Sequence, residues 1–197
     1  MPTGVALRDV RMQLFGAADR VLLRAGPSGL TTRAVTAEAG VATGVLHRHF
    51  DDFDDFLAQY ILDRIDQLDS QAAALREAAG TGTVVGNLAS ALSALFSSVA
   101  VAVVALIIFR DELRARLRRT LPAGVPVLTE GVEMVAAYLT AERERGRIDP
   151  AADVGTLAPT LIGAGHLLFA DRTGTAPDEE AVRWMVTSVL FGVLREV

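Results

Sequence analysis

The polar residues best placed to recognise another molecule lie in one stretch, from Thr32 to Phe50. The hydroxyl of Thr32 can cap a short helix by accepting from a free backbone N–H at the helix start. Gly40 can end that helix, because glycine enters the left-handed conformation without steric cost. Residues 43–49 then form a second short helix. Two short helices joined at a glycine can lay one helix in the major groove of DNA, so the sequence indicates recognition of a duplex.

Helix geometry indicates which side chains would touch the duplex. Thr43, Val45 and His47 lie on the early turns of the second helix, where base edges come within reach. Arg33 and Arg48 are better suited to phosphates, which carry no sequence information. The residues predicted to bind DNA are Thr32, Arg33, Thr43, Gly44, Val45, His47 and Arg48.

The stretch resembles the DNA-binding domain of the TetR family of bacterial one-component transcriptional regulators. The matching positions are Thr32, Val35, Ala39, Gly40, Val41, Gly44, Leu46, His49 and Phe50. The resemblance implies an all-α fold, with a three-helix domain containing a helix-turn-helix in residues 1–52 and a helical ligand-binding and dimerisation domain in residues 53–197. Helix 53–79 would connect the two domains. The implied function is that of a ligand-responsive DNA-binding repressor, a homodimer that a small apolar molecule releases from a palindromic operator.

Three residues depart from the family pattern. Ala42 stands where the family has a helix-capping serine, and Thr43 can take over the cap one residue later. His47 replaces a tyrosine that reaches a phosphate, and Phe53 replaces a lysine near the start of the next helix. These departures leave one alternative open, a small-molecule-binding or interaction dimer that has lost specific DNA binding.

The charge distribution favours DNA binding although the whole chain has a net charge of −5. Residues 1–50 contain six arginines and three acidic residues, which leaves this segment locally basic, as contact with phosphates requires. Four aspartates follow at once, at positions 51, 52, 54 and 55. Since acidic residues favour helix starts, we expect Asp52 and Asp55 to cap the next helix rather than to act as catalytic carboxylates.

Composition argues against several classes of protein. The chain has no cysteine, which excludes disulfides and thiolate metal sites. Its three histidines include no pair placed to chelate a metal, since His47 and His49 point to nearly opposite sides of a helix. The glycines between positions 80 and 86 lack the spacing of a phosphate-binding loop. We therefore expect no enzymatic activity, no metal and no cofactor, and, without a signal peptide, a cytoplasmic protein.

The rest of the chain has helical periodicity. A first helix should end at Gly26-Pro27, and Val84–Phe109 runs for 26 positions without a charge. Such a run is long enough to span a bilayer. Recurring polar residues, however, favour two buried helices with a break near Ser97-Ser98, the second ending at residues 114–119. We expect further helices through residues 132–147, 153–171 and 177–195.

The second half should hold the effector and the dimer interface. Polar residues in an apolar wall are typical of a small-molecule pocket, and the candidates are Asn87, Ser93, Phe96, Phe109, Met134, Tyr138 and His166. An ordinary hydrophobic core explains Phe96 and Met134 equally well. The last two helices are apolar on more than one face, which indicates that they need a partner. The resemblance implies that they form a four-helix bundle with a second copy. Its predicted contacts are Leu161, Ala164, Gly165, Leu168, Trp184 and Leu190.

Overall fold

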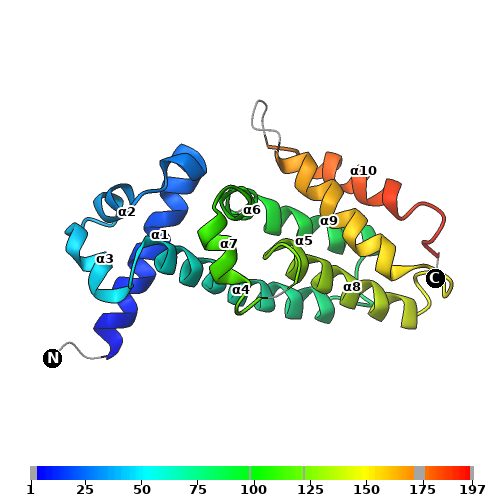
Figure 1. Ribbon diagram of the computed structural model, residues 1–197. Coiled ribbons are helices and arrows are strands. Elements are labelled where there is room, and N and C mark those ends of the chain that lie inside the picture. The colour runs from blue at the N-terminus through cyan, green and yellow to red at the C-terminus, as the bar shows by residue number, and fades with distance from the viewer. Residues whose placement is uncertain (1–3, 98, 122, 171–175, 196–197) are drawn as a thin grey trace. The chain divides into compact units, whose positions relative to one another are not determined.

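The computed structural model describes residues 4–97, 99–121, 123–170 and 176–195, with the backbone alone for residues 4–9. These residues form ten helices and no sheet strand, which confirms the all-α prediction (Figure 1). The helices are α1 (Gly4–Gly29), α2 (Thr32–Glu38), α3 (Thr43–His49), α4 (Phe53–Glu77), α5 (Val84–Phe96), α6 (Ala100–Phe109), α7 (Asp111–Leu117), α8 (Leu128–Glu144), α9 (Val154–Ala170) and α10 (Glu179–Val189).

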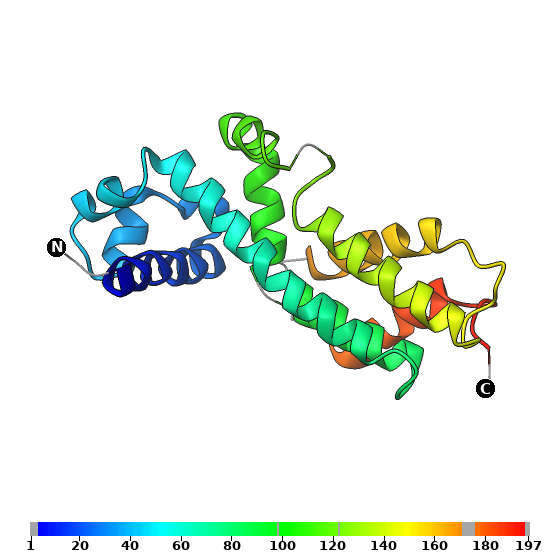
Figure 2. The same cartoon turned by 90° about the horizontal axis from the view of Figure 1, so that it is seen from below.

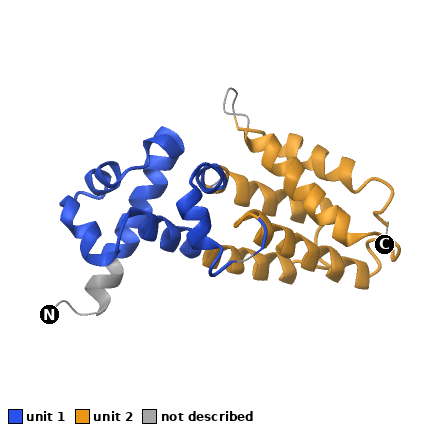
Figure 3. Ribbon diagram, viewed as in Figure 1, with its two compact units in different colours: residues 1–64, 102–124 blue, residues 65–101, 125–197 orange. Residues whose placement is uncertain are grey.

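Contacts divide the chain into two compact units (Figure 3). Unit 1 comprises residues 1–64 and 102–124, and unit 2 comprises residues 65–101 and 125–197. Unit 1 therefore adds the first half of α4, most of α6 and all of α7 to the predicted N-terminal domain of residues 1–52. Helix α4 is continuous from Phe53 to Glu77 and passes from unit 1 into unit 2 (Figure 2).

An aromatic cluster explains why the first half of α4 belongs to unit 1. The ring of Phe15 on α1 lies 5.7 Å from that of Phe56 and 5.8 Å from that of Tyr60. Phe50 packs edge-on against Phe56 at 5.1 Å between centroids. All four side chains are buried, and the burial of such large rings dominates the stability of a small core. The Tyr60 hydroxyl also donates to Asp19 at 2.6 Å, which ties α4 to α1.

The sequence predicted the end of the first helix and the cap at the start of the second. Gly26 has φ 67° and ψ −175°, so the regular part of α1 stops at the predicted Gly26-Pro27 position. The cap of α2 is Thr31 rather than Thr32, because the Thr31 hydroxyl accepts from the N–H of Ala34 at 3.2 Å. Thr32 is the first helical residue instead.

The uncharged run folds as two helices, α5 and α6, that break between Phe96 and Ala100. Leu88, Leu92 and Val103 are fully buried, as expected of core helices. Among the described residues no single helix is long and apolar enough to cross a membrane, and α5 and α6 reach the necessary length only when taken together across their break. The second helix ends at Phe109, earlier than predicted, and residues 111–117 form the separate helix α7.

Unit 2 is a helical bundle in which α8 packs on α9 and α10 packs on both α5 and α9. Its core is mainly aliphatic, and the fully buried side chains include Leu95, Val135, Leu139, Ala158, Leu161, Val182, Val186 and Leu190. Helix α10 ends at Val189, six residues before the predicted end at residue 195. The segment beyond it pairs with the loop before α9 through a short antiparallel bridge between Ile148 and Leu194.

Candidate nucleic-acid interface and second-unit site

Helix α3 presents most of the predicted DNA-contacting residues to the solvent. Thr43, Gly44, His47 and Arg48 are exposed, and Val45 is half-buried. Leu46 is fully buried and holds the helix to the core of unit 1. One face of a short helix is thus anchored and the opposite face is free, as insertion into a groove requires.

The turn between α2 and α3 is fixed by three hydrogen bonds. Gly40 has φ 68°, and its N–H donates to the Ala37 carbonyl at 3.1 Å, while the Val41 N–H donates to the Thr36 carbonyl at 3.0 Å. This pair of bonds is a Schellman motif, which requires the left-handed residue that glycine supplies. The Gln13 side chain donates to the Ala39 carbonyl at 2.8 Å and so ties the turn to α1.

The start of α3 lacks a side-chain cap. Ala42 occupies the capping position, where its methyl side chain cannot accept a hydrogen bond, and Thr43 is already the first helical residue. Thr43 therefore does not replace the missing serine, contrary to the sequence-based expectation. Its exposed hydroxyl remains free for an intermolecular contact instead.

The arginines of unit 1 have different partners. Arg20 and Arg24 both bind Glu38, at 2.7 and 2.8 Å, and their hydrogen bonds hold the pKa of this carboxyl below its usual value. The Arg11 guanidinium lies 4.9 Å from the centroid of the Phe50 ring. Within the part of the chain whose side chains the structure describes, Arg33 and Arg48 make no ion pair. These two arginines are thus available to phosphates.

The start of α4 forms the predicted capping arrangement. The Asp55 N–H donates to the Asp52 carboxylate at 2.6 Å, and the Asp51 N–H donates to the Asp55 carboxylate at 3.1 Å. The bond from the Asp55 N–H and the ion pair with Arg116 lower the pKa of Asp52. Phe53 stacks on Phe56 at 5.6 Å between centroids.

In unit 2, Asn87 and Tyr138 belong to a closed polar network. The Asn87 side-chain nitrogen lies 3.0 Å from the Tyr138 hydroxyl and also donates to the carbonyls of Ala78 and Thr81. The Tyr138 hydroxyl donates to the fully buried Glu142 at 2.6 Å, and burial is the main cause that raises the pKa of Tyr138. Since these polar atoms already have partners, this network secures the α4–α5 loop and needs no ligand to satisfy it.

Phe96 and His166 lie together on α5 and α9, with 6.0 Å between ring centroids. The ring centroid of Phe169, also on α9, lies 5.9 Å from that of Phe96. A Cβ on Gly165 would come within 2.7 Å of the Phe96 ring, so the missing side chain lets the ring reach the α9 backbone. The Nδ1 atom of His166 is buried and has no hydrogen-bond partner among the described residues. Burial lowers the pKa of His166.

The remaining candidates for the effector site are scattered. Met134 is buried in α8 and Ser93 is half-buried on α5. Phe109 belongs to unit 1 and is 81% exposed, so it does not line an interior pocket of unit 2. Within unit 2 the structure thus groups Phe96 with His166 and Asn87 with Tyr138.

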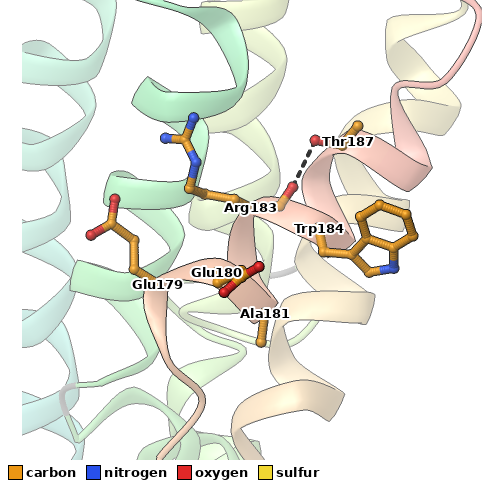
Figure 4. Close-up of a pocket in the computed structure, with 6 residues that line it drawn as sticks. All are labelled: Glu179, Glu180, Ala181, Arg183, Trp184 and Thr187. Atoms are coloured by element: carbon orange, nitrogen blue, oxygen red, sulfur yellow. Dashed lines mark hydrogen bonds between the residues drawn. The ribbon is translucent and has the colours of Figure 1, made fainter.

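The predicted dimer residues divide into buried and exposed groups. Leu161 and Leu190 are fully buried in the core of their own chain, and Gly165 is buried too, so these three offer little surface to a partner. Ala164 and Leu168 are half-buried. Trp184 is 74% exposed and lines an open hollow along α10, where it points to the opposite side from Arg183 (Figure 4).

Sequence reasoning missed three residues that the structure brings forward. Leu167 on α9 and Phe191 after α10 are large, apolar and highly exposed, and helical spacing alone could have placed Leu167 beside the predicted Ala164, three residues earlier. Glu142 is an acidic residue in a charged run, and no local signal marks it as buried. Among the described residues no group of three or more histidine or acidic side chains could hold a metal ion.

Comparison with known proteins matches the N-terminal part of the chain to a family. Residues 14–60 match the model of the bacterial regulatory proteins, tetR family. The matched residues include the second half of α1, all of α2 and α3 and the first turns of α4. No curated protein matches the chain in sequence.

Several solved structures share the fold over nearly the whole chain. A TetR-family member from Streptomyces coelicolor A3 is 25% identical, with a TM-score of 0.63, and the alignment covers 91% of this chain and 97% of that one. The transcriptional regulator FadR from Bacillus subtilis, solved with stearoyl-CoA, is 19% identical, with a TM-score of 0.68 and coverages of 92% and 98%. The multidrug binding protein EbrR, solved with malachite green, is 24% identical, with a TM-score of 0.62 and coverages of 91% and 97%.

Proposed function

We propose that this chain, whose residues 14–60 belong to the bacterial regulatory proteins of the tetR family, is a ligand-responsive regulator of transcription that binds DNA as a homodimer. The observation that carries the proposal is the arrangement of α3. Leu46 anchors it, the Schellman turn at Gly40 orients it, and the exposed Thr43, His47 and Arg48 face the solvent.

The roles of the residues follow from their chemistry. Thr43, Val45 and His47 read base edges, with the methyl groups of Thr43 and Val45 suited to thymine methyls. Arg33 and Arg48 bind phosphates, and these contacts fix the register of α3 on the duplex. Thr32 neighbours Arg33, and Gly44 lies one helical turn before Arg48. A twofold dimer would present two copies of α3, so the operator is palindromic, with half-sites about 34 Å or a multiple of it apart.

The dimer forms through α9 and α10. Trp184 and Leu167 expose large apolar surfaces on these helices, and such surfaces are typical of protein interfaces. Ala164 and Leu168 line the same helices at partly open positions. A four-helix bundle made of α9 and α10 from two copies would cover all four side chains.

The effector is a small, largely apolar molecule bound in unit 2 beside Phe96 and His166. The unpartnered Nδ1 of His166 gives such a site one polar atom within an apolar wall, and Met134 and Ser93 are further lining candidates. FadR was solved with stearoyl-CoA and EbrR with malachite green, and both ligands carry large apolar groups. Because α4 runs through both units, a ligand that favours one tilt of α4 changes the spacing of the two α3 helices and releases DNA, which makes the protein a repressor.

The test is fluorescence anisotropy with labelled DNA from the region upstream of the gene, at several salt concentrations. Specific binding should exceed binding to random DNA and should weaken steeply with salt, because phosphate contacts release counterions. The absence of DNA affinity even at low salt would contradict the proposal. It would favour a ligand-binding or interaction dimer, a role to which the aspartates after α3 are also suited.

A further inference from the structure

Four carboxylates lie directly after the helix proposed to enter the groove. Helix α3 ends at His49, α4 begins at Phe53, and Asp51, Asp52, Asp54 and Asp55 surround this corner, here called the aspartate corner. The three residues between the two helices span at most about 10 Å. This length is comparable to the Debye length of about 8–10 Å at ordinary salt, so a phosphate at the end of α3 is repelled by the corner.

Two arginines from a distant part of unit 1 bind three of the four carboxylates. Arg116 on α7 lies 2.8 Å from Asp52 and 3.5 Å from Asp55. Arg110, which precedes α7, donates to Asp54 through Nη2 at 2.8 Å and through Nε at 3.2 Å. Its guanidinium also stands 5.6 Å from the centroid of the Phe53 ring. The corner is thus covered by positive charge supplied from more than 50 residues away in sequence.

These ion pairs are poorly placed to hold the corner in shape. The side chains of Arg116 and Asp52 are 28% and 54% exposed and those of Arg110 and Asp54 are 34% and 25% exposed, and such partly exposed ion pairs add little to folding stability. The geometry has other supports, namely the Asp52 cap of α4 and the packing of Phe50 on Phe56. The main consequence of the two arginines is therefore electrostatic.

We infer that Arg110 and Arg116 offset two of the four negative charges of the aspartate corner and thereby allow DNA phosphates to approach the end of α3. Both act through the aspartates and not through a bond to DNA, so they are positioning residues for recognition. This inference rests on the proposed DNA binding and assigns α7 a part in it that the α2–α3 motif does not contain.

The experiment compares Arg116→Gln, Asp52→Asn and the double variant with the unchanged protein. Asparagine keeps the capping ability of aspartate, so Asp52→Asn removes the charge without removing the helix cap. The matched control is Arg114→Gln on the same helix, because Arg114 pairs with Asp111 and with no residue of the corner. The probe is a labelled duplex of mixed sequence, about 30 base pairs long, since repulsion between carboxylates and phosphates needs no operator. Thermal unfolding and the circular dichroism spectrum verify that each variant is folded.

Arg116→Gln should weaken binding about five-fold at low salt, and the deficit should shrink as salt screens the repulsion. Asp52→Asn should bind DNA at least as tightly as the unchanged protein. The double variant should bind with the affinity of the unchanged protein, and Arg114→Gln should change the affinity less than about two-fold. Full affinity in Arg116→Gln would overturn the inference, as would a double variant that stays as weak as Arg116→Gln, because Arg116 would then bind phosphate itself. A loss of DNA affinity in Asp52→Asn equal to that in Arg116→Gln would overturn the inference too. The ion pair would then act by holding the conformation of the corner and not through its charge. Failure of the unchanged protein to bind any duplex would instead contradict the proposed function.

Discussion

The side-chain nitrogen of Asn87 lies 3.0 Å from the hydroxyl oxygen of Tyr138, although 51 residues separate the two in sequence. The same hydroxyl donates to the buried Glu142, whose other oxygen accepts from the Gly80 N–H at 3.3 Å and lies 3.4 Å from Arg147. The loop after α4 is thus tied to α8 by a chain of polar contacts. Asn87 and Tyr138, both ligand-binding candidates in the sequence, therefore contribute to the packing of the bundle.

Removing the Tyr138 hydroxyl tests this role. Tyr138→Phe keeps the ring but leaves one oxygen of the buried Glu142 without its donor, which should lower the free energy of unfolding by about 1–3 kcal/mol. Urea denaturation measures the change. Thr120→Ala, at an exposed position after α7, is the control and should change stability by less than about 0.5 kcal/mol. Equal stability of Tyr138→Phe and the unchanged protein would show that the network is dispensable.

Phosphate contacts of the α2–α3 motif can be counted by their salt dependence. Arg33→Ala and Arg48→Ala should each weaken binding to every duplex and reduce the slope of log K against log salt by about 0.9, since each removes one phosphate neutralisation. Val45→Ala should alter the preference among sequences more than the slope. Anisotropy titrations at several salt concentrations give both quantities. An unchanged slope in Arg33→Ala and Arg48→Ala would remove these residues from the interface.

The exposed apolar surface of α9 and α10 predicts the oligomeric state. Trp184→Glu should convert a dimer into a monomer, because it places a charge on a surface proposed to be buried in the dimer. Sedimentation velocity distinguishes the two states. The unchanged protein should also unfold at a temperature that rises with its concentration, and the variant should not. The same helix offers a control, Glu179→Gln, whose side chain points away from Trp184 (Figure 4) and which should remain dimeric. A Trp184→Glu protein that stays dimeric would locate the interface elsewhere.

The pKa of His166 predicts a pH dependence of stability. Burial lowers this pKa in the folded chain, so the unfolded chain binds the proton more readily. The contribution of His166 to the free energy of unfolding should therefore be full above pH 6.5, the pKa of the unfolded chain's histidine, and should be lost as the pH falls below it. Urea midpoints between about pH 7.5 and about pH 5 should fall less in His166→Gln than in the unchanged protein. Parallel curves for the two proteins would exclude His166 as the source of the dependence.

The all-α class, the turn between α2 and α3 and the aspartate cap of α4 could be predicted from the sequence alone. Helix periodicity, the glycine at position 40 and the aspartate caps act over three to five residues, so each is readable without the fold. The break between α5 and α6 was readable for the same reason. The identity of the α2 cap and the end of α6 were misplaced, because neighbouring threonines and continuous apolar runs give nearly equal local signals.

Which side chains contact one another depends on how the helices pack. Leu161 and Leu167 are equally apolar in the sequence, but packing against the chain's own helices buries Leu161 and leaves Leu167 exposed. It likewise brings Arg116 to Asp52 across 64 residues and encloses Glu142 among its partners. Such contacts depend on how whole helices pack, since the free energy of burial is shared among many residues far apart in sequence and leaves no mark on any short segment.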